Sequence, residues 1–197
     1  MILTHGANSL KSNENIIGGK EYSVTKIGNQ IWLAENLVYE FPGLVIGNES
    51  SASNIRACYY DNNKSKYAGN GLLYTWYAAK YLDDNKSTLI PGWRVPSAND
   101  WSILMNTAGG QSYAGKKLKS TIGWTTGAGT DDYGFNAKPY GRNDAGFKDL
   151  GYGAYFWTSS ENGTTLGLYR FLNSADYVST YDGSKANSYS VRLVKDA

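Results

Sequence analysis

The sequence has very few of the side chains that carry common enzyme chemistry. Its 197 residues include one cysteine, Cys58, and one histidine, His5. A single cysteine excludes an intramolecular disulfide and a thiolate cage for a metal, so packing must hold the fold. A single histidine, in a polar N-terminal stretch, excludes serine–histidine triads, cysteine–histidine dyads and histidine-rich zinc sites. We therefore expect no enzymatic activity, no cofactor and no metal site.

The chain also lacks a strong charge of one sign and a long hydrophobic run. Nineteen basic and seventeen acidic residues leave a formal net charge of +2, and no run of Lys or Arg is long enough to follow a phosphate backbone. Residues 1–12 contain one short apolar pair followed by polar residues, so they do not resemble a secretory signal or a membrane span. Either a signal was removed or none existed. These absences predict no nucleic-acid partner and no membrane insertion.

Aromatic residues and glycine are abundant instead. Six Trp, seventeen Tyr and a 41% hydrophobic fraction are enough for one substantial core, which predicts an N-terminal segment at 1–19 and a single domain at 20–197. The 23 Gly, the low charged fraction of 18% and the many Tyr, Ser, Asn and Thr are typical of extracellular or virion surface proteins. We therefore expect the chain on a phage tail or a cell surface.

Local patterns predict one hairpin and two helices. Residues 21–37 favour extended structure on both sides of a Gly-Asn turn, which indicates a hairpin. Residues 71–82 place apolar side chains at helical spacing. Ser97, with Asp100 three residues later, has the signature of a capping box at the start of a second helix, which a Gly pair at 109–110 ends.

The second half of the chain predicts short strands. From residue 116 onward, apolar segments are broken by Gly and polar pairs. These segments are 117–124, 133–139, 155–159, 168–172, 177–180 and 188–194. Two helices followed by short antiparallel strands make an α+β architecture.

Seven sequence blocks occur in an order that is typical of one known family. The blocks are KIGNQIWLAENL (26–37), GLLYTWYAA (71–79), GWRVPSANDW (92–101), AGKKLKS with GW (114–120 and 123–124), DDYGFNAKP (131–139), FWTSSE (156–161) and SYSVRLVKD (188–196). Together they resemble the Fibrobacter succinogenes major paralogous domain, a group of bacterial and phage-encoded domains placed with the C-type-lectin-like folds. The resemblance covers residues 20–196. It implies a loop-rich α+β domain with paired terminal strands and two helices flanking a small, twisted, mainly antiparallel sheet.

Related folds with known chemistry do not extend to this chain. The block at 92–101 also resembles a stretch of formylglycine-generating enzymes, but those enzymes need a cysteine pair, and only Cys58 is present. Calcium-dependent lectins carry EPN or QPD and WND triplets, none of which occurs here. The adjacent acidic pairs at 83–84 and 131–132 are typical of solvated turns, because calcium needs six to eight oxygen ligands. We expect neither catalysis nor calcium-dependent sugar binding.

The segment 161–190 has the composition of a recognition surface. Of the 29 residues from 162 to 190, 20 are Asn, Asp, Ser, Thr, Gly or Tyr, a mixture that paratopes use, although an exposed sheet has it as well. The family resemblance favours recognition. Lectin-like domains of this kind serve as the variable proteins of diversity-generating retroelements, in which adenine-directed mutagenesis rewrites a C-terminal segment between fixed blocks such as 156–161 and 188–196.

Strand alternation predicts which side chains of this segment point outward. Leu168, Phe171 and Val178 are expected to face the core, and a slip of one residue would exchange the inward and outward sets. The residues that we expect to bind the ligand are Asn162, Thr164, Tyr169, Arg170, Asn173, Tyr177, Ser179 and Tyr181.

The sequence thus predicts a non-enzymatic module that binds a cell-surface protein or glycan. A structural or assembly domain of a phage tail or bacterial surface protein, without a dedicated ligand, is the alternative. A homo-oligomer fits either hypothesis, and the sequence does not decide the oligomeric state.

Overall fold

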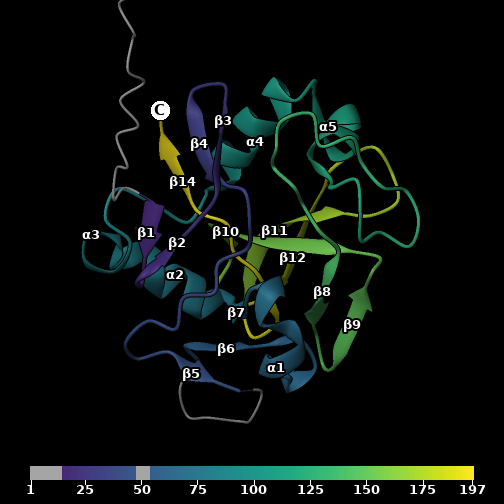
Figure 1. The fold of residues 1–197 in the computed structure, drawn as a ribbon. Helices are drawn as coiled ribbons and strands as arrows, with labels where there is room; N and C mark the ends of the chain where they lie inside the picture. Colours follow the sequence, from purple (N-terminus) through teal and green to yellow (C-terminus); the bar gives the residue numbers. More distant parts are fainter. Residues whose placement is uncertain (1–14, 48–53) are drawn as a thin grey trace, which may run out of the picture.

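A computed structural model describes residues 15–47 and 54–197 of the chain (Figure 1). Within these ranges the fold is α+β, with five α-helices and sheets that are mostly antiparallel. His5 and most of the expected N-terminal segment lie outside the described residues. No helix in the described ranges is long and apolar enough to cross a membrane.

The two ends of the domain meet in one small sheet. Strands β3 (Val24–Ile27) and β4 (Gln30–Leu33) form an antiparallel hairpin, and β14 (Val194–Asp196) pairs antiparallel with β4. Gly28 adopts a φ of 61° in the turn, a conformation that glycine reaches without strain. The predicted hairpin and the predicted pairing of the terminal strands are therefore confirmed (Figure 1).

A larger sheet runs through the centre of the molecule. Most of its neighbouring strands are antiparallel, whereas β10 pairs parallel with β8 and with β13, and β5 pairs parallel with β6. Its order is β12 (Ser179–Ser184), β11 (Leu166–Leu172), β10 (Ala154–Asn162), β8 (Tyr140–Asn143), β13 (Ser188–Ser190), β7 (Leu73–Thr75), β6 (Arg56–Cys58) and β5 (Val45–Ile46), with β9 (Phe147–Leu150) beside β8. A separate two-stranded sheet pairs β1 (Ile16–Ile17) with β2 (Lys20–Glu21).

The predicted strands of the C-terminal half are largely present. Those at 155–159 and 168–172 are confirmed as parts of β10 and β11. The strand expected at 177–180 begins two residues later, as β12. The segment 188–194 divides into β13 and β14, which belong to different sheets.

Both predicted helices are present with defined N-terminal caps, but the helix expected at 71–82 begins only at Trp76, because residues 73–75 form β7. Helix α2 (Trp76–Asp84) follows β7 directly, because the Thr75 hydroxyl accepts a hydrogen bond from the Ala78 amide. Helix α4 (Ala98–Thr107) starts at Ser97 with the complete capping box, so that prediction is confirmed.

Two predicted strands are wrong. Residues 117–124 continue the end of α5 (Gln111–Leu118) into a loop, and residues 133–139 contribute only an isolated bridge between Ala137 and Lys119. The remaining helices are short: α1 (Lys64–Tyr67), α3 (Lys86–Leu89) and two 3-10 turns at Tyr60–Asn62 and Ala68–Asn70.

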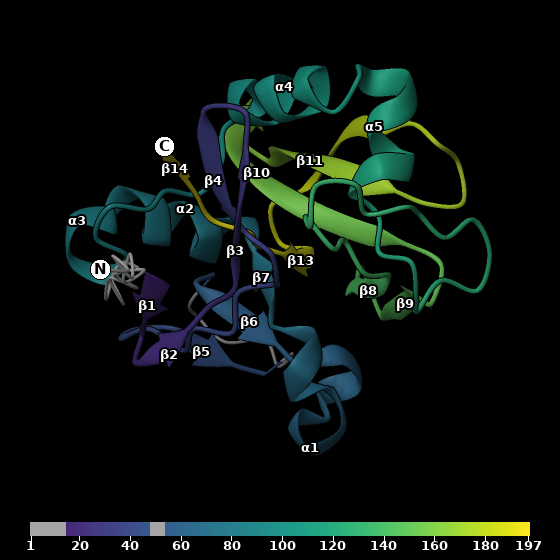
Figure 2. The same cartoon turned by 45° about the horizontal axis from the view of Figure 1, so that its top comes forward.

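Helices α4 and α5 cover one face of the strands β10 and β11 (Figure 2). The core between them is largely aromatic: Trp32 and Trp101 meet edge to face with ring centroids 5.3 Å apart, and Phe156 packs 5.5 Å from Trp101. A second core lies on the other side, where Trp157 packs against Tyr189. Both faces of this sheet therefore contain buried side chains.

Asp100 links the α4 cap to the terminal strands. Its carboxylate accepts hydrogen bonds from the Ser97 amide (2.8 Å) and from Nη2 of Arg94 (2.7 Å), and Arg94 also pairs with Asp196 on β14 (2.8 Å). Burial by itself would raise the pKa of Asp100. The hydrogen bonds from Arg94 and Ser97 outweigh it and hold the pKa below its usual value.

We expect Asp100→Asn to lower the free energy of unfolding by about 1–2 kcal/mol at pH 7, through loss of the charged cap and ion pair. Because the folded pKa lies below the unfolded one, the contribution of Asp100 is present above the unfolded pKa and is lost as pH falls through the folded pKa. Urea titrations at pH 7 and below about pH 4 should therefore show a smaller acid loss in the variant. Asp84→Asn removes an exposed pair with Lys80 and should change stability by less than about 0.5 kcal/mol. Equal acid losses in Asp100→Asn and the wild type would contradict the prediction.

Candidate ligand-binding surface

Strands β10, β11 and β12 bring aromatic residues onto one side of the sheet. Tyr155 is paired with Phe171, Trp157 with Tyr169, and Tyr169 with Tyr181. Paired residues lie on the same face and alternate residues share it, so all five side chains point the same way. This is the face away from α4 and α5.

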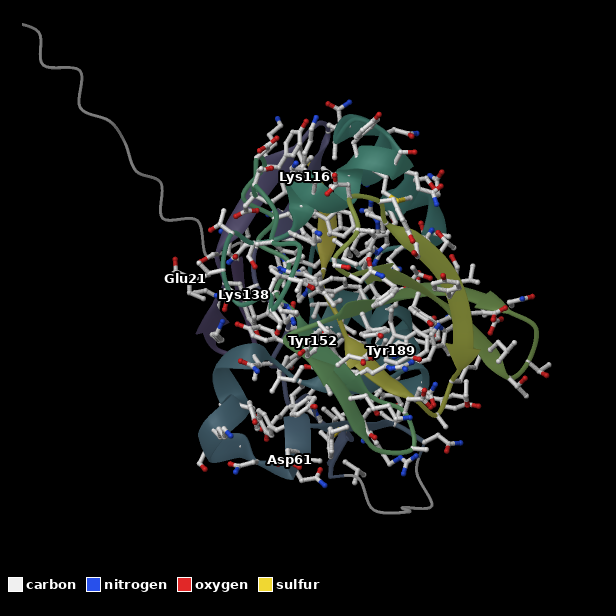
Figure 3. All side chains as sticks on the ribbon, turned by 90° about the vertical axis from the view of Figure 1, so that its right-hand side faces the viewer. Glu21, Asp61, Lys116, Lys138, Tyr152 and Tyr189 are labelled. Atoms are coloured by element: carbon white, nitrogen blue, oxygen red, sulfur yellow. The ribbon has the colours of Figure 1, made fainter. Side chains whose placement is uncertain are left out.

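We call the group Tyr155, Tyr169, Phe171, Tyr181 and Tyr189 the tyrosine face. Tyr189 comes from β13, and Figure 3 shows it among the side chains beside β12. Its ring centroid lies 5.4 Å from Tyr155 and 4.8 Å from Tyr169, and the rings of Tyr155 and Phe171 stack at 4.5 Å. Contacts of this kind fix the rings with little rotational freedom.

The tyrosine face is buried at its centre and open at one edge. Tyr155, Tyr169 and Tyr189 are buried, Phe171 is half-buried and Tyr181 is 51% exposed. The Tyr181 ring lies 5.9 Å from Tyr169. The aromatic core thus reaches solvent through rings that are already held in place.

A charged group borders the tyrosine face. The guanidinium of Arg142, on β8, lies 4.9 Å from the centre of the Tyr155 ring and pairs with Asp144 (3.2 Å) and Asp149 (3.1 Å). The Tyr155 hydroxyl donates to Asp149 at 2.7 Å. Burial, and then the bond to Asp149, raise the pKa of Tyr155, and burial raises the pKa of Tyr169 to about 12. Both phenols therefore stay protonated at neutral pH and can donate hydrogen bonds.

A buried lysine holds the turn between β10 and β11. The ammonium of Lys185 binds the Glu161 carboxylate at 2.5 Å and the backbone oxygens of Thr164 (2.9 Å) and Gly163 (3.2 Å). It also lies 4.3 Å from the centre of the Trp76 ring. Two of its three oxygen contacts are to backbone, so they do not depend on the side chain at 164, whereas the φ of 72° at Gly163 favours glycine.

A second buried lysine holds the loop after β11 in the same way. Lys119 donates to the backbone oxygens of Gly127 (2.5 Å), Asn173 (2.8 Å) and Ala175 (2.9 Å). Burial lowers its pKa. Both loops that border the C-terminal strands are therefore fixed partly through their main chain, and each presents exposed side chains, among them Thr164 and Tyr177.

The structure places part of the predicted ligand-binding set at the surface. Tyr177 is 48% exposed, and Asn162 and Thr164 are exposed at the turn after β10, where Asn162 donates to Asp182 at 2.7 Å. Asn173 is half-buried in the loop that Lys119 holds. Asn162 and Thr164 thus lie at the β10–β11 turn, Tyr181 lies on β12, and Asn173 and Tyr177 lie in the loop after β11.

The outward orientation predicted for Tyr169, Arg170 and Ser179 is wrong. They are 8%, 3% and 8% exposed, respectively. Tyr169 and Arg170 are adjacent on β11, so they point to opposite faces: Tyr169 lies within the tyrosine face, and Arg170 lies under α4, where it donates to the Ala98 oxygen at 3.1 Å. Ser179 is paired with Phe171 and lies on the same face.

The prediction of which side chains face the core is confirmed only in part. Val178 is buried, whereas Leu168 is half-buried and Phe171 is partly open on the tyrosine face. The charged border of Arg142, Asp144 and Asp149 was not predicted, because Gly141 and Gly146 interrupt the strand pattern there. No signal in the sequence joins that segment to β10; only the sheet order does.

Residues 15–47 and 54–197 contain no group of three His, Cys, Asp or Glu side chains that could hold a metal ion.

Comparison with known families gives one match, which covers most of the chain. The model of the Fibrobacter succinogenes major domain matches residues 25–195. The chain belongs to this family. No curated protein and no solved structure gave a significant match. This Fibrobacter succinogenes major domain runs from β3 to β14 and includes the tyrosine face and both buried lysines.

Proposed function

We propose that this Fibrobacter succinogenes major domain is a non-enzymatic binding module that recognises a protein on a cell surface through its C-terminal strands and loops. The observation that carries the proposal is the tyrosine face, where packed rings reach solvent at Tyr181 and the Arg142 group borders the rings at Tyr155. Protein interfaces use this arrangement, in which rigid aromatic anchors are surrounded by polar groups. Tyr, Ser and Asn side chains on the neighbouring loops add adaptable hydrogen bonding.

We further propose that the fold is C-type-lectin-like and that its C-terminal segment is diversified by a retroelement. The paired terminal strands and the two main helices, α2 and α4, support the fold assignment. The contacts of Lys119 and Lys185 to main-chain oxygens support diversification, because they hold the loops for many different side chains. A reverse transcriptase gene and a near-identical template repeat beside the coding gene are expected. A gene neighbourhood with neither would contradict diversification.

The exposed tyrosines of this surface should contribute to the affinity for the ligand but not to the stability of the fold. We expect Tyr177→Ala combined with Tyr181→Ala to weaken binding to the host cell surface about tenfold or more, because central tyrosines commonly contribute about 2 kcal/mol or more. The melting temperature should stay close to that of the wild type, since both rings are about half exposed. Tyr169 and Arg170 are left intact because they are buried and their loss would perturb the fold.

Tyr81→Ala is the matched control, since Tyr81 is a partly exposed tyrosine on α2, outside the C-terminal segment. It should leave binding unchanged. Full binding by the Tyr177/Tyr181 double variant would reject the assigned surface. It would favour the alternative, a structural domain of a phage tail or bacterial surface protein that has no dedicated ligand.

A further inference from the structure

A polar cleft lies apart from the tyrosine face. It has a volume of about 490 Å³ and opens between the residues that flank the β3–β4 hairpin (23 and 34–36) and the segment 131–140, with Gly69 and Arg192 contributing to its wall. No residue of the segment 161–190 lines it. The volume falls within the range of pockets that hold small molecules.

Arg192 presents an unused donor in this cleft. The side chain is 1% exposed, and it donates to Asn36 Oδ1 (3.1 Å) and to the backbone oxygens of Leu33 (3.3 Å), Asn136 (2.9 Å) and Phe135. A guanidinium has five N–H donors, so one hydrogen on Nη2 meets no acceptor in the part of the chain that the structure describes. A buried charged donor without a partner is costly, which favours a ligand oxygen at this position.

Asp131 presents an unused acceptor in the same cleft. Its Oδ1 accepts a hydrogen bond from the Asn136 amide at 2.6 Å, while Oδ2 has no donor among the described residues. Burial raises the pKa of Asp131, and the Asn136 amide and Arg192 only partly offset it. Asp131 and Arg192 influence each other electrostatically, yet no ion pair joins them within the described ranges. The cleft is therefore lined by a donor of Arg192 and an acceptor of Asp131 that do not bond to each other.

The other charged groups of the cleft differ in how well they are satisfied. Glu35 is occupied by Lys20 (2.7 Å) and the Ser23 amide (3.0 Å). Lys138, labelled in Figure 3, lines the cleft, and its ammonium has no acceptor among the residues described. Two acids and two bases line the cleft, so their formal charges balance and the site favours a ligand without net charge.

We propose that this cleft binds a pyranose sugar through neighbouring hydroxyl groups. A hydroxyl both donates and accepts, so one group can accept from Arg192 Nη2 and donate to Asp131 Oδ2. A neighbouring hydroxyl accepts from Lys138. A zwitterionic ligand fits less well, because an ammonium at Asp131 would lie beside the Arg192 guanidinium and be repelled.

The test is titration of the folded protein with the methyl glycosides of glucose, mannose, galactose and N-acetylglucosamine, followed by saturation-transfer NMR and calorimetry. At least one glycoside should bind the wild type. Asp131→Asn combined with Lys138→Met should weaken it about tenfold or more, because each lost charge-assisted hydrogen bond contributes about 1.5–3 kcal/mol. Asn at 131 keeps the acceptor for the Asn136 amide and tolerates the local φ of 50°, so the turn should survive.

Asp132→Asn is the matched control, since Asp132 is the exposed neighbour of Asp131 and does not line the cleft. It should bind like the wild type, as should Tyr181→Ala, which lies on the tyrosine face. Binding of none of the glycosides, binding that the double variant retains, or binding of glycine in their place would each overturn the proposal. A column with an immobilised oligosaccharide that ends in the same sugar distinguishes the two sources of the ligand. Retention of the protein on this column indicates that the ligand is the end of a glycan. Binding of the free glycoside without retention indicates a soluble sugar.

Discussion

Replacing Arg192 with leucine is expected to lower the free energy of unfolding by roughly 3–5 kcal/mol, the cost of leaving the hydrogen-bond acceptors around this buried side chain without a donor. The guanidinium lies between two rings, 4.4 Å from the centre of Phe135 and 5.3 Å from that of Phe156. Burial lowers the pKa of Arg192 to about 9, so the group keeps its charge at pH 7. Its stabilisation therefore comes from the acceptors that surround it.

Leucine at this position would leave four buried acceptors without a donor. They are the backbone oxygens of Leu33, Phe135 and Asn136 and the side-chain oxygen of Asn36. These acceptors belong to the end of β4, to the residues that follow it and to the segment 131–139. Arg192 thus joins the first hairpin, a central loop and the C-terminal strands, and its loss should reduce the cooperativity of the whole domain.

Urea unfolding followed by tryptophan fluorescence measures this effect. Arg192→Lys keeps the charge but cannot reproduce the planar arrangement of donors, so an intermediate loss is expected. A leucine variant within about 1 kcal/mol of the wild type would show that the four acceptors find other donors, and it would contradict the argument.

The elements that the sequence predicted correctly are those whose signals are local. The capping box at Ser97 and Asp100 and the turn at Gly28 each depend on a few neighbouring residues, and both appear in the structure. Helix α5 was missed for a tertiary reason. Gly115 disfavours a helix, but a Cβ atom there would lie 2.5 Å from the Tyr177 backbone oxygen, so close packing requires glycine.

The composition of the sequence located the candidate site, but the predicted orientation of several of its side chains was wrong. The segment 161–190 contains two of the exposed tyrosines, Tyr177 and Tyr181, yet an alternation rule that expects one apolar face and one polar face fails when both faces of a sheet are buried. On β11 the tyrosine face contains Tyr169, and the helix-covered face contains Arg170. The charged border on β8 depends on strand order, which a linear pattern does not contain.

Arg170 is the counterpart of Arg192, and the opposite result is expected for it. It is 3% exposed, its Nη2 atom donates to the Ala98 oxygen, and neither Nε nor Nη1 meets an acceptor among the residues described. Burial lowers its pKa. Burying a charge with so few partners costs free energy, and hydrophobic replacements of poorly compensated buried charges are neutral or stabilising by roughly 1–4 kcal/mol.

Arg170→Met keeps an unbranched side chain of similar length, so we expect it to raise the free energy of unfolding by about 1–3 kcal/mol in urea titrations. Binding through the tyrosine face should not change, because residue 170 points towards α4. Arg170→Ala would create a cavity and serves as the control for lost packing; it should be less stable than the methionine variant. Destabilisation by the methionine variant would mean that the guanidinium is better compensated than these contacts indicate. A stabilising effect would mean that Arg170 was not selected for stability. This is what we expect of a residue inside the segment 161–190, which we propose to be diversified. Arg192 follows that segment, in the block 188–196 that we propose to be constant.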